Sequence, residues 1–233
     1  MMKKQQALER VTKVTRSPYQ MIFWDWNGTL LDDRDYAIAV RNRVFPGFGL
    51  PRLESVAEYF SQFTFPVREY YTRAGVTDEA FVEVANAWMA EYVRGAENIP
   101  LHGDALAAME AFQSAGLLQV VLSASDLGIL SRQLSHYGMQ DSFAAVLGLS
   151  HIYATSKQAI GQAYLSECGV PPAACLLLGD TLHDADVARE MGIGCILVAR
   201  GHQSHEALKT AGVPVCGSLL EAVALCLGAT QAP

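Results

Sequence analysis

The sequence has few cysteines and no long hydrophobic run. Its five cysteines all lie in the last third of the 233 residues, and none forms a C-x-x-C pair. We therefore expect buried free thiols in a reducing compartment. No apolar run approaches the roughly 20 residues that a membrane-spanning helix needs. The first 20 residues contain lysine and arginine but no following apolar stretch, which is not the pattern of a secretory signal. These features predict a cytoplasmic protein with a tail over residues 1–17.

The chain also lacks an excess of positive charge. Its net charge is -7, with 17 basic and 24 acidic residues, and this disfavours nucleic acid or an anionic membrane as a partner. An anionic small molecule remains compatible with this charge, because a bound metal ion reverses the sign of one cleft. Hydrophobic residues make up 51% of the chain, which is enough for a sizeable core. The length suits one α/β domain, or a core domain with a smaller insert.

Short apolar runs alternate with helical patterns over most of the chain. The runs lack polar alternation, which indicates that both faces of the sheet are covered, as in a parallel sheet. Helical stretches such as 104–116, ending at Gly116, separate them. This alternation predicts an α/β fold with a doubly wound, Rossmann-like parallel sheet. Strands are expected at 21–24, 118–123, 144–149, 175–180, 195–200 and, as a short last one, 213–217.

Residues 33–103 interrupt the alternation and contain no convincing strand. Helical spacing predicts that one face of the segment near Trp88 is apolar. The residues on that face are Phe81, Val84, Ala85, Trp88, Met89, Tyr92 and Val93. We therefore expect an inserted helical cap over 33–103, and an α/β core built from 18–32 and 104–233.

Polar side chains follow the predicted strands at their carboxyl ends. Asp25 follows the first strand, Ser123 ends the second, and Lys157 comes after the third; Asp180 and Asp184 follow the fourth. In an open parallel sheet, ligands bind beyond these ends, so we expect the five residues to face one crevice. Taken singly, the serine and the acids also fit helix caps or turns, and the lysine fits a solvated surface.

Taken together, these residues suit phosphoryl transfer. A carboxylate such as Asp25 attacks a phosphoryl group and forms an aspartyl-phosphate, which splits one displacement into two. The acids after the fourth strand, with Asp25, offer the oxygen ligands that Mg²⁺ prefers. Lys157, Ser123 and backbone N–H groups stabilise phosphoryl oxygens. Gly28 allows the backbone to turn closely around such a site.

These residues resemble the motifs of the haloacid dehalogenase superfamily. The likeness spans residues 20–227 and is greatest to the phosphoglycolate phosphatase-like subgroup. The first motif of that family, D-x-D-G-T, corresponds to "DWNGT" except at Asn27. The remaining correspondences are Ser123 for the second motif, Lys157 for the third, "GDTLHD" at 179–184 for the fourth, and a P-x-x-G turn at 100–103.

The resemblance implies a Mg²⁺-dependent phosphatase of a small phosphate ester that works through an aspartyl-phosphate. The implied catalytic residues are Asp25, Ser123 and Lys157. The implied phosphate-binding residues are Gly28, Thr29, Ser123, Ala124 and Lys157. The implied metal ligands are Asp25, Asp180 and the backbone carbonyl of Asn27, with Asp184 supporting the site.

Asn27 departs from the motif. The family phosphatases have an aspartate there, which protonates the leaving group and then activates water. An amide cannot carry that proton, and general acid–base help is worth about 10²–10⁴-fold in rate. Two functions therefore stay open. One is a slow phosphatase, and the other is a catalytically idle protein of this fold that binds a phosphorylated ligand or a protein partner. The intact Asp25, with the polar residues after the other strands, favours the first.

Other relatives that lack the acid fit the sequence less well. The phosphonate hydrolases of the superfamily use a cap lysine, and this chain has no lysine between Lys13 and Lys157. The dehalogenases need no Mg²⁺ site. His183, inside the fourth motif, titrates near neutral pH, and we expect it on the surface. Substrate and oligomeric state do not follow from the sequence, although arginines of the insert are candidates for holding a second anionic group. They are Arg34, Arg41, Arg43, Arg68 and Arg73.

Overall fold

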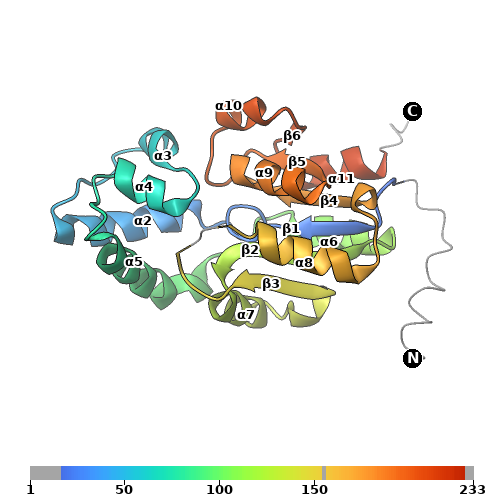
Figure 1. Cartoon of the computed structure of the whole chain (residues 1–233), viewed down its shortest axis with the longest axis horizontal. Helices are drawn as coiled ribbons and strands as arrows, with labels where there is room; N and C mark the ends of the chain where they lie inside the picture. Colours follow the sequence, from blue (N-terminus) through green and yellow to red (C-terminus); the bar gives the residue numbers. More distant parts are fainter. Residues whose placement is uncertain (1–16, 154–155, 229–233) are drawn as a thin grey trace.

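The computed structural model describes residues 17–153 and 156–228. Its centre is a six-stranded parallel sheet with the order β3-β2-β1-β4-β5-β6 (Figure 1). The predicted doubly wound, Rossmann-like fold is confirmed. The strands are β1 (Met21–Trp24), β2 (Leu118–Asp126), β3 (Ala145–Leu149), β4 (Cys175–Gly179), β5 (Gly194–Val198) and β6 (Val215–Cys216).

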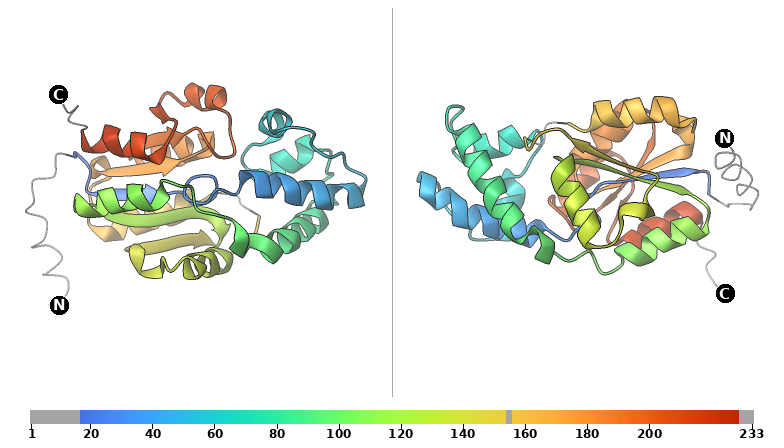
Figure 2. Two further views of the ribbon diagram at one scale, coloured as in Figure 1. Left: turned by 180° about the vertical axis from the view of Figure 1, so that it is seen from behind. Right: turned by 90° about the horizontal axis from the view of Figure 1, so that it is seen from below.

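Helices cover both faces of the sheet (Figure 2). One face packs against α6 (Ala105–Ser114), α7 (Leu127–His136) and α11 (Leu219–Leu227). The other packs against α8 (Gln158–Cys168), α9 (Leu182–Met191) and α10 (His205–Leu208). Side chains of β1 alternate between the two layers, with Ile22 and Trp24 in the first core cluster and Met21 and Phe23 in the second. This two-sided burial explains why the strands are continuous apolar runs. Short 3₁₀ helices lie at η4 (Gln140–Ser142), η5 (Pro172–Ala174) and η6 (Lys209–Ala211).

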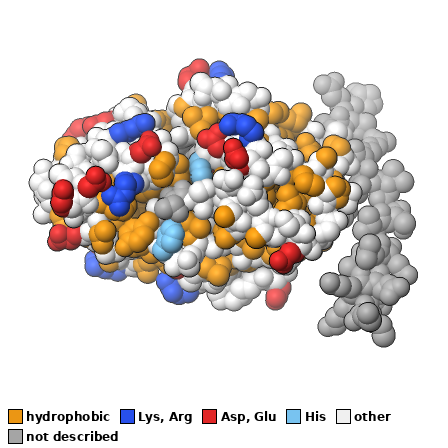
Figure 3. Space-filling model, viewed as in Figure 1, with side chains coloured by type: hydrophobic (Ala, Val, Ile, Leu, Met, Phe, Trp, Pro, Cys, Tyr) orange, Lys and Arg blue, Asp and Glu red, His pale blue; other side chains and the backbone are white. Residues whose placement is uncertain are grey.

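A helical insert, residues 34–98, lies at one end of the sheet (Figure 1). Its helices have a hydrophobic cluster of their own. On the face shown in Figure 3, basic and acidic side chains lie next to one another over this insert. Its elements are α2 (Arg34–Val44), η2 (Phe45–Phe48), α3 (Val56–Gln62), α4 (Val67–Arg73), α5 (Phe81–Gly95) and η3 (Ala96–Asn98). The exact cap boundaries, 33 and 103, stay a prediction.

The predicted apolar face of α5 is present except at one position. Phe81, Val84 and Tyr92 are buried, and Trp88 packs against the cores as a partly buried side chain. Val93 is 37% exposed, so its assignment to this face is wrong. At 3.6 residues per turn it lies about 120° around the helix from Phe81, which turns its side chain away from the core.

The sheet register brings the polar residues to one edge. Trp24 of β1 pairs with Val121 of β2 and with Leu178 of β4. Asp25, Ser123 and Asp180 therefore lie just beyond that row, at neighbouring strands. We expected strand β2 to end at Ser123, but it continues to Asp126. Its register against β3 shifts between Leu122 and Asp126, so this end of the strand is irregular, although Asp126 still pairs with Leu149 of β3.

Two further expectations concern the termini and the cysteines. Residues 1–16 of the predicted tail lie outside the described part of the chain. The cysteines are free thiols, as predicted, and four of the five are buried. Among the residues that the structure describes, there is no helix long and apolar enough to cross a membrane.

Candidate active site

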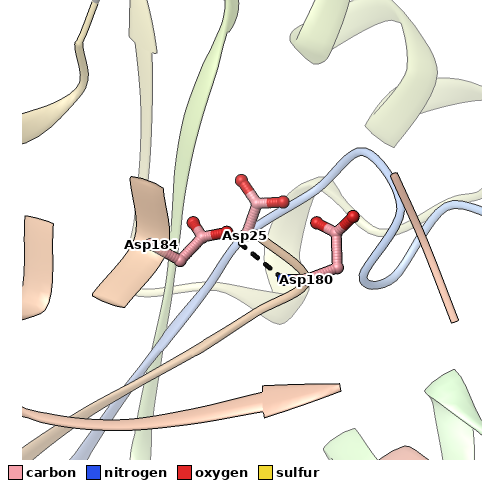
Figure 4. A group of neighbouring side chains, drawn as sticks. All are labelled: Asp25, Asp180 and Asp184. Carbon is pink, nitrogen blue, oxygen red and sulfur yellow. Dashed lines mark hydrogen bonds between the residues drawn. The ribbon is translucent and has the colours of Figure 1, made fainter. Parts of the chain in front are cut away.

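Three carboxylates meet at the carboxyl edge of the sheet (Figure 4). Asp25 follows β1, Asp180 follows β4, and Asp184 lies in the first turn of α9. They are buried, and one oxygen of each lies within 4.8 Å of those of the other two. Burial and the neighbouring Asp184 raise the pKa of Asp25 to about 6, against the opposing effect of a nearby lysine. Burial raises the pKa of Asp180 well above its usual range, and the other two carboxylates add to this effect.

Lys157 is the cation of this cluster. Its buried Nζ contacts Asp25 Oδ1 and lies 2.6 Å from Asp184 Oδ1. Burial alone would lower the pKa of Lys157, but the two carboxylates raise it, so the ammonium stays charged. In return, that charge holds the pKa of Asp184 below its usual value in spite of burial. Three carboxylates share one ammonium, which leaves a formal excess of negative charge in a buried place.

The start of α9 orients Asp184. Thr181 caps this helix, since its hydroxyl accepts from the Asp184 N–H while Asp184 Oδ2 accepts from the Thr181 hydroxyl and backbone N–H. The same oxygen accepts from the Asp180 N–H at 3.2 Å (Figure 4). The alternative interpretation of Asp180 as the helix cap is therefore wrong. With Thr181 in that role, the Asp180 carboxylate points into the acid cluster.

Two glycines allow the backbone to close around Asp180. A Cβ atom on Gly28 would lie 2.3 Å from Asp180 Oδ2, and one on Gly201 would lie 2.0 Å from it. Gly28 also has a φ of 74°, which side chains other than glycine rarely adopt. The backbone N–H of His202 donates to Asp180 Oδ2 at 2.6 Å. The hydroxyl of Thr29 bridges Asp25 and Asp180, at 3.3 and 3.2 Å.

The amide of Asn27 is held by three hydrogen bonds. Its Nδ2 donates to Asp33 Oδ2 at 2.7 Å and to the hydroxyl of Tyr92 at 3.0 Å. Its Oδ1 accepts from the Ser125 hydroxyl at 2.6 Å. An ionised aspartate at position 27 would lie directly against the Asp33 carboxylate, and two like charges this close do not both stay ionised. The neighbouring Asp33 therefore gives a physical reason for the amide.

Asp33 belongs to a buried chain of polar groups that the sequence reasoning missed. Its Oδ1 accepts from the Gly28 N–H at 2.8 Å and lies 3.0 Å from His202 Nε2. His202 Nδ1 shares a 2.7 Å hydrogen bond with the Tyr59 hydroxyl of the insert. Although burial opposes both shifts, this pairing lowers the pKa of Asp33 and raises the pKa of His202 to about 9. The signal for His202 was its place in "RGHQ", just beyond β5, at the same edge of the sheet as the predicted residues.

A cavity of about 150 Å³ opens between this edge and the helical insert. Its wall includes the predicted Asp25, Asn27, Ser123, Ala124, Lys157, Asp180 and Asp184. Ser123 is buried, and its hydroxyl accepts from the Ser125 N–H. Asp126, directly before α7, caps that helix, so Ser123 is not its cap. The predicted phosphate-binding residues Gly28 and Thr29 lie around Asp180 and are not among the described residues of the wall.

His183 is part of the cavity wall and not a surface loop residue, which corrects the expectation for it. It lies in α9, where its ring stacks on Phe65 of the insert with centroids 4.6 Å apart. Burial lowers the pKa of His183, and the charge of Lys157 lowers it further. Its ring is therefore neutral at neutral pH.

The donor set suits a hard divalent cation. Asp25 and Asp180 both line the cavity and offer carboxylate oxygens within 4.8 Å of each other, and the backbone carbonyl of Asn27 as a third ligand stays a prediction. Oxygen ligands of this kind fit Mg²⁺. A bound cation would offset the excess of buried negative charge and lower the raised pKa of Asp180.

An acid after the first strand, a lysine and an acidic pair around one cavity of a doubly wound sheet define an α/β protein with a site suited to phosphoryl chemistry. The model of the haloacid dehalogenase-like hydrolases matches residues 19–192, and the chain belongs to this family. The predicted resemblance is confirmed.

Relatives and solved structures agree with this assignment. The phosphoglycolate phosphatase of Synechococcus elongatus is 24% identical over 195 residues, which covers 82% of this chain and 89% of that protein. A predicted phosphatase from Clostridium acetobutylicum has a similar structure, with a TM-score of 0.79, 17% identity, and 91% and 99% of the two chains covered. CbbY of Rhodobacter sphaeroides, solved in complex with phosphate, gives a TM-score of 0.69 at 20% identity, covering 87% and 96%. The family match confirms the prediction of an enzyme, a hydrolase, and the solved structures share its fold.

The close approach at Gly201 makes a steric prediction. Gly201→Ala should lower the free energy of unfolding by about 1–3 kcal/mol, because its methyl group overpacks the loop against Asp180. Gly47→Ala is the matched control, since a Cβ at Gly47 meets nothing within 4 Å. Urea unfolding of the two variants measures the difference. Equal stability of the two variants would show that the loop around Asp180 is loose.

The Asn27–Asp33 pair makes a second prediction. Asn27→Asp alone should destabilise the protein, because it places two carboxylates together and removes a donated hydrogen bond. Adding Asp33→Asn exchanges the acid and the amide, and should recover part of the loss, with a coupling energy of about 0.5–3 kcal/mol. Urea unfolding without metal at neutral pH measures this cycle, and the exposed Asn98→Asp controls for added charge. Strictly additive effects would contradict the pairing.

Proposed function

We propose that this protein is a Mg²⁺-dependent phosphatase of small phosphate esters that acts through an aspartyl-phosphate on Asp25. One observation carries the proposal: the Asp25 carboxylate lies in the cavity wall in contact with a charged lysine, and within 4.8 Å of carboxylate oxygens of Asp180 and Asp184. A site that only binds a phosphorylated ligand has no need of a carboxylate facing that ligand, because the two anions repel each other. A carboxylate in this place has a use when it is the nucleophile.

The chemistry takes two displacements. One Asp25 carboxylate oxygen attacks phosphorus, and the bond from phosphorus to the ester oxygen breaks with its electron pair leaving on that oxygen. A water molecule then attacks phosphorus, the bond to Asp25 breaks, and inorganic phosphate and the free carboxylate result. Lys157 and the hydroxyl of Ser123 offset the charge of the phosphoryl oxygens in both steps. Lys157 also contacts Asp25 and so fixes its direction.

Mg²⁺, when bound, supplies the positive charge that lets the carboxylate and the phosphoryl group approach each other. Asp25, Asp180 and the backbone carbonyl of Asn27 would hold it. Asp184 supports this arrangement, because it accepts from the Asp180 N–H and pairs with Lys157. The phosphate held by CbbY supports phosphate as the ligand of the same fold.

The second candidate function, a catalytically idle binding protein, is favoured by Asn27. Its amide is bound to Asp33, Tyr92 and Ser125 and has no proton to give to a leaving group. Under the phosphatase proposal, Asn27 makes the enzyme slower. The leaving group departs unprotonated, and water attacks without a base at this position. The proposal also includes a small-molecule partner and a cytoplasmic location.

Replacement of the nucleophile tests the phosphatase proposal. Asp25→Asn should abolish phosphate release from a panel of phosphate esters assayed with Mg²⁺. It should leave the melting temperature equal or higher, because the raised pKa of Asp25 means that its ionised form destabilises the folded state at neutral pH. The exposed Asp141→Asn is the control for loss of one carboxylate. Turnover by Asp25→Asn would exclude the covalent route, and no turnover by the unmodified protein on any ester would favour the binding protein.

Metal binding is testable without turnover. Mg²⁺ at about 100 times its dissociation constant should stabilise the protein by about 2.7 kcal/mol. The stabilisation should disappear in Asp180→Asn, which removes a ligand but keeps the shape of the side chain. Thermal unfolding with and without Mg²⁺ measures both proteins. An equal stabilisation of Asp180→Asn would place the ion elsewhere.

A further inference from the structure

The substrate class can be read from the cavity, given the proposed function. The cavity volume of about 150 Å³ has to hold the phosphoryl group at Asp25 and Lys157 as well, so it suits a small group of about the size of one ring. Its wall on the side of the insert is aromatic. Phe63, Phe65, Tyr71, Phe81 and Trp88 come from the insert, and Tyr153 comes from the segment after β3. Rings in such a wall favour a flat apolar group by stacking and by edge-to-face contacts.

The charges around the cavity disfavour a second anionic group on the substrate. Lys157 is the one lysine among the described residues of the wall, which include no arginine, and it already pairs with two carboxylates. Asp33 and Asp126 also line the cavity, and the charged His202 in the same wall is already paired with Asp33. A carboxylate tail, such as the one that phosphoglycolate carries, would meet aromatic rings and two further acids. It would lose its hydration there without gaining a partner.

The arginines that the sequence offered for this purpose do not line the cavity. Arg41 is buried with its guanidinium 4.6 Å from the Phe45 ring centroid, donates to Gln62, and is not part of the wall. The other four pair with acidic side chains of the insert. These pairs are Arg34–Asp35, Arg43–Glu91, Arg68–Asp78 and Arg73–Glu69.

The leaving-group chemistry points to the same class independently. Asn27 does not protonate the departing oxygen. Both ring nitrogens of the charged His202 are already bonded to Tyr59 and Asp33, so the departing oxygen leaves as an anion. A phenol has a pKa of about 10, as in tyrosine, whereas water, the parent of alkoxide leaving groups, has a pKa near 15.7. An aryl oxide therefore departs without a proton far more readily than an alkoxide. It takes the electron pair of the broken bond with phosphorus and afterwards acquires a proton from solvent.

We infer that the substrates of this site are phosphate monoesters of single-ring phenols without a second anionic group. The ring lies against the aromatic wall, and the phosphoryl group lies at Asp25 and Lys157. Phe65 is a specificity-determining residue in this arrangement. It lines the cavity and stacks on His183, which belongs to the same helix turn as Asp184.

Four esters separate the two arguments. Phenyl phosphate has a ring and a good leaving group, and benzyl phosphate has a ring and a poor leaving group. Ethyl phosphate has neither a ring nor a good leaving group. 2-Phosphoglycolate carries an additional carboxylate. With Mg²⁺, kcat/KM for phenyl phosphate should exceed that for benzyl phosphate by about 10²–10⁴-fold, the value of the missing proton transfer. Calorimetric binding to Asp25→Asn should rank phenyl and benzyl phosphate together, with ethyl phosphate and 2-phosphoglycolate weaker.

A variant of the wall tests the role of the ring. Phe65→Ala should lower kcat/KM for phenyl phosphate by about five- to tenfold and leave that for ethyl phosphate within about twofold, because only the aryl ester loses a stacking partner. Phe48→Ala is the matched control, since Phe48 packs inside the insert and does not line the cavity. Equal losses on both esters would show that Phe65 merely supports the fold.

The outcomes distinguish this inference from the proposed function. Hydrolysis of 2-phosphoglycolate with a higher kcat/KM than phenyl phosphate, or its tighter binding to Asp25→Asn, would overturn the inference and leave the phosphatase intact. An absence of turnover on all four esters, in the unmodified protein with Mg²⁺, would overturn the proposed function itself. A preference for phenyl phosphate that Phe65→Ala reduces would support both.

Discussion

The burial of three carboxylates around one ammonium is the constraint on which the rest of this site depends. Charged groups removed from water are costly unless they are paired. Lys157 pairs with Asp25 and Asp184 directly, whereas Asp180 is served by the His202 N–H and the Thr29 hydroxyl. The raised pKa of Asp25 and Asp180 shows that this pairing is incomplete. An incoming cation or electrophile would therefore stabilise the ionised forms of these two acids.

The backbone around the cluster is shaped by the same constraint. Gly28 and Gly201 bring two loops against Asp180, closer than any side chain allows. The parallel register then places Asp25, Ser123 and Asp180 just beyond the same row of three adjacent strands, β2, β1 and β4. Two-sided burial of the sheet makes this alignment rigid, because its core side chains interdigitate with helices on both faces.

Much of this arrangement could be predicted from the sequence, and the reasons are physical. Continuous apolar runs indicate buried parallel strands, and residues just after such strands must meet at one edge. This reasoning finds Asp25, Lys157 and Asp180. It does not find Asp33, which follows a loop and not a strand, and whose importance arises from its contact with Asn27 across a turn.

The same limit applies wherever distant segments meet. The contacts of Tyr59 with His202, and of Phe65 with His183, join the insert to the sheet over more than one hundred residues of sequence. No local pattern encodes such pairs. The bulged end of β2 escaped prediction for a related reason, since its register depends on the neighbouring strand.

Asn27 and the aromatic wall form one account of the chemistry. The Asn27 amide is held in place by its neighbour Asp33. Because an amide stands there, the site lacks a proton donor for the leaving group and a base for water. Under the proposed function, such an enzyme would favour leaving groups that need no proton and would release phosphate from Asp25 slowly. The helical insert supplies a surface that suits such leaving groups.

The central claim is that Asp25 becomes phosphorylated during turnover. Rapid quenching into acid of the protein mixed with Mg²⁺ and phenyl phosphate, followed by mass spectrometry of its peptides, tests the claim most directly. The account predicts a phosphoryl group on the peptide that contains Asp25, formed in the first turnover together with a burst of phenol, because the second step lacks its base. Release of phosphate in step with phenol, with no phosphorylated peptide at any time, would contradict it.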